Sequence, residues 1–392
     1  MEKIKVLTVF GTRPEAIKMA PVVKELHKQS EHFESIVVVT AQHREMLDQV
    51  LKTFDIQPDY DLNIMKEGQT LSTITANVLL GLDQIMKEAK PDIVLVHGDT
   101  TTTFAASISA FYNQIKVGHV EAGLRTWDKY SPFPEEMNRQ LTDVIADIYF
   151  APTANSKENL MEENRPEEHI YITGNTAIDA LHQTVQKNYQ LPVFKEIDAD
   201  KKVILVTMHR RENQGAPMER VFKAIRQVID QYEDTEVVFP VHLNPAVQQL
   251  AEEILGKYPR IHLIDPLDVI DFHNLIAKSY MIMTDSGGIQ EESPSLGKPV
   301  LVLRETTERP EGVDAGTLKL VGTQTETILK EMTQLLENET AYQRMAKASN
   351  PYGDGAASKR ILNAITYEFG LTGERPENFL TEETFNSAES RL

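Results

Sequence analysis

The run Tyr280-Met281-Ile282-Met283-Thr284-Asp285-Ser286-Gly287-Gly288 decides the fold that this sequence predicts. Its first five residues form a short, mostly apolar strand, and Ile289-Gln290-Glu291-Glu292 continues as a helix beyond the two glycines. A glycine turn between a strand and a helix lets backbone N–H groups approach a phosphate at the positive end of the helix. Since Glu292 follows within the helix, it could reach the hydroxyls of a ribose. The stretch therefore predicts an α/β unit that binds a nucleotide diphosphate.

Short apolar runs of this kind recur along the chain, with helical stretches between them. This is the pattern of buried parallel strands in a βαβ series. In the first half we predict strands at Val6–Phe10, Ile36–Val39, Ile93–Val96, Val117–Val120, Ile148–Phe150 and Ile170–Ile172. After a polar connection, the second half has predicted strands at Val203–Val206, Val237–Val241, Ile261–Ile264, Met281–Met283 and Val300–Leu303.

The two halves also begin alike, because Val6–Arg13 and Val203–Arg210 each join an apolar strand to a loop that ends in arginine. A chain of 392 residues suits two domains of roughly 150–200 residues. We therefore predict an α/β protein of two Rossmann-like, doubly wound domains facing across a cleft, with ligand chemistry at the carboxyl ends of the strands. The expected ranges are 1–174, 175–364, and 365–392 for a helix end and polar tail. A single large sheet is the weaker alternative.

The composition narrows the class of protein. With 40 basic and 59 acidic residues the formal net charge is −19, so the field of the whole molecule repels polyanions. Neither nucleic acid nor an anionic membrane is expected as a partner. There is no cysteine, which excludes disulfides, thiolate metal sites and cysteine nucleophiles. We find neither a signal peptide nor an apolar run near the ~18 residues of a transmembrane helix, and we expect a cytoplasmic protein.

Three carboxylates of the first half stand where an active site would need them. Asp99 and Glu121 follow the third and fourth predicted strands, and Glu135 opens a helix after a proline-rich loop. Helix capping explains Asp99 equally well, and the helix dipole alone could account for Glu135. Because the carboxyl ends of parallel strands meet at one edge of the sheet, the three together predict an acid/base site.

Cationic side chains accompany the predicted phosphate site. The first loop, Gly11-Thr12-Arg13-Pro14-Glu15-Ala16-Ile17-Lys18, matches neither the dinucleotide fingerprint nor the P-loop spacing. Arg13 and Lys18 could both point at a phosphate, although a solvated helix start remains the alternative. Arg309 follows the strand Val300–Leu303, and a guanidinium beside the glycine turn would complement a diphosphate.

His209 ends the first strand of the second half, where an imidazole could face a ligand. A lone histidine is more often structural than catalytic, but the position of His209 across from the first-half loop favours both roles about equally, so its role stays open at this point. The sequence contains no H-E-x-x-H motif, and its eleven histidines are not spaced as ligand pairs. No metal site is therefore expected.

Several of these motifs are long and specific, and together they closely resemble the non-hydrolysing bacterial UDP-N-acetylglucosamine 2-epimerases. The resemblance runs from the first strand to about residue 365 and leaves only the polar tail outside. The motifs that carry it are Gly11–Lys18, His119–Thr126, Thr173–Thr176, His209–Asn213, Asp285–Gly288 and Thr306–Pro310.

The resemblance implies the two-domain glycosyltransferase-B architecture, a homodimer, and reversible conversion of UDP-GlcNAc into UDP-ManNAc without NAD, metal or other cofactor. It also implies a product used for cell-surface polysaccharide. Since the C2 proton of the sugar is very weakly acidic, inversion at C2 would proceed by elimination of UDP to enzyme-bound 2-acetamidoglucal and re-addition of UDP. Such a reaction needs proton-transfer groups on both faces of C2 and stabilisation of departing UDP.

The resemblance also implies roles for particular residues. It places Asp99, Glu121 and Glu135 at catalytic positions, without saying which is the base on each face, and His209 at a catalytic or substrate-binding position. The residues at UDP-binding positions are Arg13, Lys18, Ser286, Gly287, Gly288 and Arg309, with Glu292 on the ribose and Phe272 near the uracil.

Bacterial members of this family also bind a second UDP-GlcNAc molecule as an activator. The corresponding positions here are Gln42, His43, Gln69, Glu136, Arg210 and His242. The family segment before Gln69 often carries a basic residue where this chain has Gly68, so weaker activation is expected.

Three alternatives remain open from the sequence. A glycosyltransferase of the same architecture would use the same UDP pocket but would leave C2 of the sugar unchanged. A hydrolysing epimerase would release free ManNAc and UDP, although this chain has no fused kinase half. A nucleotide-sugar sensor is the non-enzymatic alternative, against which the full set of proposed catalytic residues counts.

Overall fold

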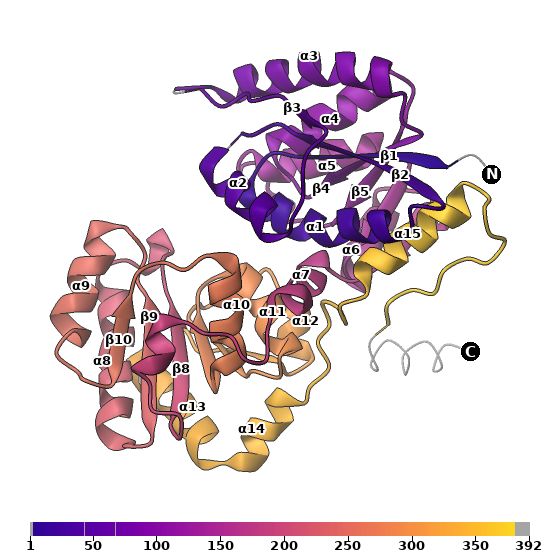
Figure 1. Cartoon of the computed structure of the whole chain (residues 1–392). Coiled ribbons are helices and arrows are strands. Elements are labelled where there is room, and N and C mark those ends of the chain that lie inside the picture. The colour runs from indigo at the N-terminus through magenta and orange to yellow at the C-terminus, as the bar shows by residue number, and fades with distance from the viewer. Residues whose placement is uncertain (1–2, 43, 67, 381–392) are drawn as a thin grey trace. The chain divides into compact units, whose positions relative to one another are not determined.

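The computed structural model describes residues 3–42, 44–66 and 68–380. The chain divides into two compact units, which we call unit 1 (Met1–Gln183 with Tyr352–Leu392) and unit 2 (Thr184–Pro351). Each unit contains one twisted sheet with helices on both faces (Figure 1).

Unit 1 is built on a seven-stranded parallel sheet with the order β3-β2-β1-β4-β5-β6-β7. The order reverses between β1 and β4, which is the topological switch point where ligands bind in folds of this class. Its strands are β1 (Ile4–Phe10), β2 (Phe33–Val39), β3 (Tyr60–Asp61), β4 (Ile93–His97), β5 (Lys116–Val120), β6 (Ile148–Ala151) and β7 (Ile170–Ile172).

Alternating side chains of the unit 1 strands enter two different cores. In β1, Val6 and Phe10 pack in the core shared with α1 and α15, whereas Leu7 and Val9 pack in the core beneath α3 and α4. Because both faces are buried, the strands are mostly apolar. The helices are α1 (Arg13–Lys28), α2 (Arg44–Thr53), α3 (Leu71–Ala89), α4 (Thr101–Tyr112), α5 (Glu135–Ile145), α6 (Ala154–Glu162), η1 (Glu167–His169), α7 (Thr176–Thr184) and α15 (Ala357–Glu368).

Unit 2 repeats this plan with six parallel strands in the order β10-β9-β8-β11-β12-β13, and its switch point lies between β8 and β11. The strands are β8 (Lys202–Thr207), β9 (Thr235–Pro240), β10 (Ile261–Ile264), β11 (Met281–Thr284), β12 (Val300–Val302) and β13 (Leu318–Leu320). The helices are η2 (Pro192–Lys195), η3 (Arg211–Asn213), α8 (Ala216–Gln231), α9 (Pro245–Leu255), α10 (Val269–Lys278), α11 (Gly287–Ser295), α12 (Pro310–Asp314), α13 (Thr325–Glu337) and α14 (Glu339–Ala346).

These two sheets confirm the predicted α/β class and the two doubly wound units. Every predicted strand is present, with ends that differ by a few residues at most. The sequence analysis missed β3 and β13, which lie at sheet edges and have two and three residues. Strands this short carry too few residues to show a pattern.

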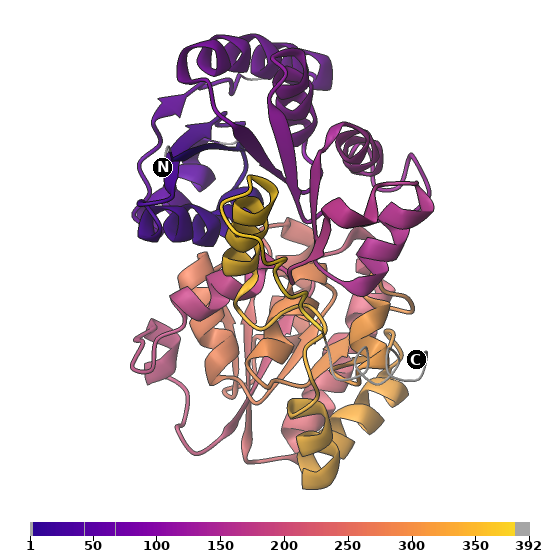
Figure 2. The ribbon, with the colours of Figure 1, turned by 90° about the vertical axis from the view of Figure 1, so that its right-hand side faces the viewer.

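The boundaries of the units differ from the expected ones at 174 and 364. The chain returns to unit 1 at Tyr352, because Ile361, Leu362 and Ile365 of α15 are fully buried in the core that contains α1. Figure 2 shows α15, in yellow, beside the indigo helix of unit 1. The last part of the predicted tail, residues 381–392, lies outside the described residues.

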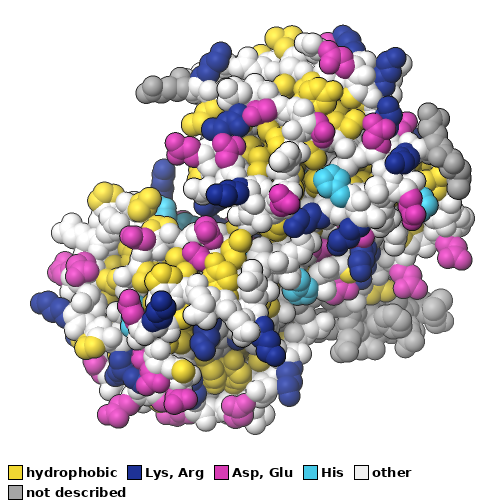
Figure 3. Space-filling model, viewed as in Figure 1, with side chains coloured by type: hydrophobic (Ala, Val, Ile, Leu, Met, Phe, Trp, Pro, Cys, Tyr) yellow, Lys and Arg dark blue, Asp and Glu magenta, His cyan; other side chains and the backbone are white. Residues whose placement is uncertain are grey.

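Within the described ranges, no helix is long and apolar enough to cross a membrane. On the face shown in Figure 3, Lys and Arg side chains are interspersed with Asp and Glu side chains. The acidic excess is therefore not gathered in one region of this face, and an anionic ligand needs particular cations placed by the fold.

Candidate active site

A buried carboxylate ties together two loops at the switch point of unit 1. Glu15, which is 2% exposed, accepts hydrogen bonds from the backbone N–H groups of Gly11 (3.0 Å) and Thr12 (2.8 Å) at the start of α1. Its other oxygen accepts a hydrogen bond from the Thr100 hydroxyl (2.6 Å) in the loop after β4. A Cβ atom on Gly11 would lie 2.0 Å from Oγ1 of Thr40, so only glycine fits there. This arrangement fixes the loop that carries Arg13, which is exposed.

Glu121 lies directly after β5 with a φ of 66°, in the left-handed region that non-glycine residues rarely adopt. Its side chain is almost buried and forms an ion pair with Lys18 of α1. Nδ2 of Asn175 donates a hydrogen bond to the same carboxylate at 2.9 Å. Burial would raise the pKa of Glu121, but the Lys18 ammonium and His97 together hold that pKa well below its usual range. Glu121 is therefore kept ionised.

Asp99 lies in the loop after β4, and its surroundings raise its pKa, whereas those of Glu121 lower the pKa of that residue. Burial raises the pKa of Asp99, and the negative charges of Glu121 and Glu135 raise it further, against the opposing charge of Arg139. Nη2 of Arg139 lies 2.7 Å from Oδ2 of Asp99. The structure thus brings the three predicted carboxylates into one electrostatic cluster, with Glu135 partly exposed at the first turn of α5.

A second buried network supports this cluster. His119 of β5 contacts Asp143 of α5 through Nδ1 (2.6 Å) and the carbonyl oxygen of Gly98 through Nε2 (2.7 Å). Asp143 also accepts hydrogen bonds from the Gly123 N–H and from the Arg125 guanidinium (2.7 Å). His119, Asp143 and Arg125 therefore hold in place the loops that carry Asp99 and Glu121.

In unit 2, a buried carboxylate again joins the two loops at the switch point. Asp285, fully buried after β11, accepts hydrogen bonds from the backbone N–H groups of His209 (3.1 Å) and Arg210 (2.9 Å) and from Nδ2 of Asn213 (3.0 Å). Its Oδ1 also lies 3.3 Å from Nδ1 of His209. The imidazole of His209, 43% exposed, stacks on His242 with ring centroids 5.8 Å apart.

The predicted neighbours of the glycine turn are near it. Ser286 precedes α11, and the N–H groups of Gly287 and Gly288 form the first turn of that helix. A Cβ atom on Gly287 would lie 3.0 Å from Cζ of Arg309, which places the guanidinium over the turn. Backbone donors at a helix start and an arginine together make an anion site.

The residues expected to hold the nucleoside lie close by. Oε2 of Glu292 is 3.6 Å from Nε2 of His273 on α10. Phe272 precedes His273 on that helix and is partly buried against the core next to β8 and β11. A ribose contact by Glu292 and a uracil contact by Phe272 remain predictions.

The residues expected to bind an activator come from both units. Gln42 accepts a hydrogen bond from Thr102 (3.1 Å), and Gln69 accepts one from the Lys66 N–H (3.3 Å). Glu136 is fully buried, and its carboxylate accepts hydrogen bonds from the N–H groups of Thr126 and Trp127 (both 3.1 Å). Nε of Arg210 donates to the carbonyl oxygen of Asp285, and His242 stacks on His209 as above. His43 lies outside the described residues.

Comparisons with known proteins identify the family. A family model described as UDP-N-acetylglucosamine 2-epimerase matches residues 24–366. The UDP-N-acetylglucosamine 2-epimerase of Bacillus subtilis (strain 168) is 62% identical over 379 residues, which are 97% of this chain and 99% of that protein. The chain belongs to the UDP-N-acetylglucosamine 2-epimerase family. The expected enzyme class, the non-hydrolysing bacterial epimerases, is thereby confirmed.

Solved structures of epimerases agree with this assignment. A crystal structure of a UDP-N-acetylglucosamine 2-epimerase has 60% identity and a TM-score of 0.91, covering 97% of this chain and 100% of that one. The epimerase from Neisseria meningitidis bound to UDP-GlcNAc has 52% identity and a TM-score of 0.82, covering 92% of this chain and 99% of that one.

Some residues of this epimerase's site were missed by the sequence analysis. Arg139 pairs with Asp99, and Asn175 and His97 both contact Glu121, yet none of the three had been assigned a role. Arg139 had a signal, because it lies one helical turn after Glu135 and shares its face of α5. Lys18, predicted to bind phosphate, lies on Glu121 in this structure. Among the described residues, no group of three or more His, Asp or Glu side chains could hold a metal ion.

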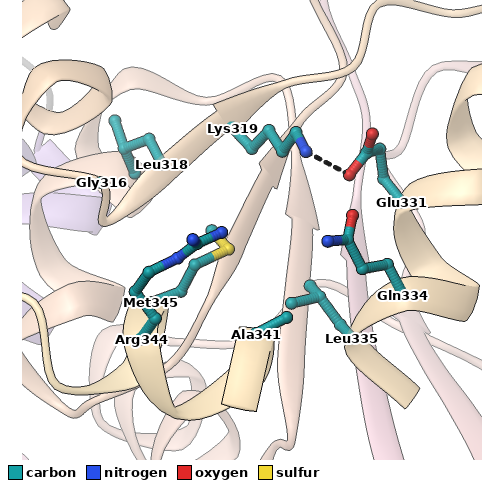
Figure 4. Close-up of a pocket in the computed structure, with 9 residues that line it drawn as sticks. All are labelled: Gly316, Leu318, Lys319, Glu331, Gln334, Leu335, Ala341, Arg344 and Met345. Carbon is teal, nitrogen blue, oxygen red and sulfur yellow. Dashed lines mark ion pairs between the residues drawn. The ribbon is translucent and has the colours of Figure 1, made fainter. Parts of the chain in front are cut away.

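A separate pocket of about 250 Å3 in unit 2 is not part of this site. It lies near the beginning of β13, between α13 and α14. Doubly wound folds instead bind their ligands at the carboxyl ends of the strands. Figure 4 shows Lys319 of this pocket paired with Glu331.

The opposite environments of Glu121 and Asp99 can be tested by titration. We expect side-chain carboxyl NMR to show the pKa of Glu121 below its ordinary value and that of Asp99 above it. Lys18→Met should raise the pKa of Glu121, because it removes the main compensating charge. Lys87→Met is the matched control, since it removes the partner of Asp83 on the surface of α3 and should raise only the pKa of Asp83.

The same shift predicts a change in stability with pH. Because the pKa of Glu121 is lower in the folded chain than in the unfolded one, its ionised form stabilises the fold above the unfolded pKa. This stabilisation is lost as the pH falls through the folded pKa, and Lys18→Met should weaken that loss. An unchanged Glu121 titration in Lys18→Met would contradict the assignment.

Proposed function

We propose that this epimerase interconverts UDP-GlcNAc and UDP-ManNAc by eliminating and re-adding UDP. In the first step a carboxylate takes the C2 proton, the C–H electron pair forms the C1–C2 double bond, and UDP leaves with the electrons of the C1–O bond. In the second step UDP re-adds at C1 of 2-acetamidoglucal while the opposite face of C2 is protonated. Supplying ManNAc for cell-surface polysaccharide is part of the proposal.

The observation that carries this proposal is the contrast between Glu121 and Asp99. Inversion by proton transfer needs one group ready to accept a proton and another ready to donate one. Lys18 and His97 keep Glu121 ionised, whereas burial and the neighbouring carboxylates favour a proton on Asp99. Pairs of acids whose environments push their pKa values apart are typical of acid/base catalysis. Glu135 completes the group and would help to position the sugar ring.

Unit 2 would stabilise the departing UDP. The first-turn N–H groups of α11 and the guanidinium of Arg309 form a fixed set of donors that suits a diphosphate. His209, oriented by Asp285, would contact the phosphate or the glycosidic oxygen. The epimerase from N. meningitidis has been crystallised with UDP-GlcNAc, which supports the same ligand here. Arg13 of unit 1 would add a further cation.

Deuterium incorporation at C2 tests the function directly. When the protein is incubated with UDP-GlcNAc alone in D2O, we expect UDP-ManNAc to form and both sugars to carry deuterium at C2. Glu121→Gln should lower the exchange rate by about 100-fold or more, since a positioned acid or base contributes about 10²–10⁴-fold.

The control is Glu219→Gln, which changes a surface carboxylate paired with Lys223 on α8 of unit 2 and should leave the exchange rate unchanged. A wild-type enzyme that leaves C2 unlabelled would instead favour the glycosyltransferase alternative. Free UDP accumulating in step with turnover would favour the hydrolysing alternative.

Activation by a second UDP-GlcNAc molecule is a further part of the proposal. The carboxylate of Glu136 holds the backbone of Thr126 and Trp127, and Trp127 is exposed. An activator that binds the carboxylate of Glu136 would compete with these backbone N–H groups and would therefore shift the loop that leads to Glu135. In unit 2, an activator that binds His242 would also affect His209, because the two rings are stacked.

This proposal predicts a sigmoidal dependence of initial rate on UDP-GlcNAc and no turnover from pure UDP-ManNAc. His242→Ala should bring the Hill coefficient towards one, because it removes a predicted activator contact. Hyperbolic kinetics in both directions for the wild-type enzyme would contradict activation.

The homodimer also stays a proposal, and exposed apolar side chains support it. Leu80 of α3, Phe111 and Tyr112 of α4, and Val144 of α5 are each more than half exposed on helices that pack beside one another. Exposed apolar groups of this kind mark association surfaces. Light scattering should give the mass of a dimer for the wild type and of a monomer for Phe111→Asp. A monomeric wild type would contradict this. A cytoplasmic location likewise stays a prediction.

A further inference from the structure

His97, the last residue of β4, is a buried histidine to which the mechanism so far assigns only an electrostatic effect on Glu121. Its side chain is only about 5% exposed, and neither ring nitrogen has a hydrogen-bond partner among the described residues. The neighbouring His119 of β5 differs, because both of its ring nitrogens are within 2.7 Å of a partner. Buried polar atoms without partners are rare in folded proteins and call for an explanation.

The ring of His97 lies close to Glu121, the candidate base. Nε2 of His97 lies 3.6 Å from Oε2 of Glu121, slightly beyond hydrogen-bond distance. The other charged groups around the pair are Lys18 of α1, which contacts Glu121, and Asp99, which is paired with Arg139 of α5. His97 therefore stands within the carboxylate cluster and not in the supporting network of His119.

Among the described residues, the side chains that contact Glu121 are those of Lys18, Asn175 and His97. The ammonium of Lys18 is only a donor, and the amide of Asn175 neither gains nor loses a proton. An imidazole changes its charge between about pH 5 and 8. A small movement would bring Nε2 into hydrogen-bond distance of Glu121, and no hydrogen bond to another described residue would have to break.

We propose that His97 is a positioning residue that shares one proton with Glu121, so that the pair takes up and returns the proton exchanged at C2. This inference rests on the proposed function. Glu121 takes the proton from C2 as UDP departs, and the neutral ring of His97 accepts that proton through Nε2. The carboxylate is thereby restored beside Lys18. In the reverse reaction the pair returns a proton to C2 from the same face. After a forward turnover, in which Asp99 protonates the opposite face, the pair loses its proton to solvent and Asp99 regains one from solvent, so the total number of protons and electrons is unchanged.

Two substitutions separate proton sharing from simple orientation. Gln at position 97 keeps an N–H donor of similar reach but cannot exchange a proton, whereas Phe keeps only the size of the ring. We expect His97→Gln and His97→Phe both to lower kcat by about 100-fold or more, with little change in KM. His262→Gln is the matched control, because it alters a histidine–glutamate pair of unit 2 (His262 Nε2 to Glu236 Oε2, 2.8 Å).

The pH profile of kcat gives a readout that a purely structural role would not move. As the pH falls, the first proton that the wild-type pair binds goes to His97. The ring is then no longer neutral and cannot accept a proton from Glu121, so kcat falls on the acid side of the profile, the acid limb. In His97→Gln that step is absent, and residual activity should persist to lower pH until Glu121 itself is protonated. The acid limb should therefore shift to lower pH.

The outcomes distinguish this inference from the proposed function. Absence of C2 deuteration by the wild type would defeat the proposed function. If the wild type exchanges C2 normally, either of two results would overturn only the role of His97. One is a kcat near the wild-type value with an unchanged acid limb in His97→Gln. The other is activity that is retained in His97→Gln and lost only in His97→Phe.

If the variants do not fold, NMR titration of the wild-type ring decides. The imidazole must gain a proton across the acid limb, and a ring that keeps one charge throughout would refute the sharing.

Discussion

The ion pair between Lys18 and Glu121 is the interaction on which the account of this site depends. It joins the first helix to the loop after the fifth strand, and it keeps a nearly buried carboxylate ionised. Without a compensating cation, burial would push Glu121 towards its neutral form, and the contrast with Asp99 would disappear.

In each unit, one buried carboxylate holds together two loops at the carboxyl edge of the sheet. In unit 1, Glu15 binds the loop after β1 to the loop after β4. In unit 2, Asp285 binds the loop after β8 to its own loop after β11. Each carboxylate is buried and crosses the topological switch point, where parallel strands diverge and leave backbone groups unpaired. These two carboxylates thus hold the loops at the carboxyl edge of their sheets in place.

The sequence predicted the features that depend on neighbouring residues along the chain. Buried strands are continuous apolar runs, and Asp99, Glu121 and the Ser286-Gly287-Gly288 turn follow them directly, so their positions could be predicted. The return of α15 to unit 1 could not, because an apolar stripe does not specify which core it enters. His97 was missed for a similar reason, because its contact with Glu121 is made between neighbouring strands and a histidine is not distinctive by itself. Arg139 could have been found, since it lies one helical turn after Glu135.

The most direct test of the central claim is whether the C1–O bond of UDP-GlcNAc breaks during turnover. The substrate would carry 18O at the bridging position between C1 and the β-phosphorus, and phosphorus NMR would follow that label in recovered UDP-GlcNAc. Elimination frees the β-phosphate to rotate before UDP re-adds, so the account predicts that 18O spreads from the bridging to the non-bridging positions as C2 exchanges. C2 exchange and epimerisation with the label fixed in the bridge would contradict it.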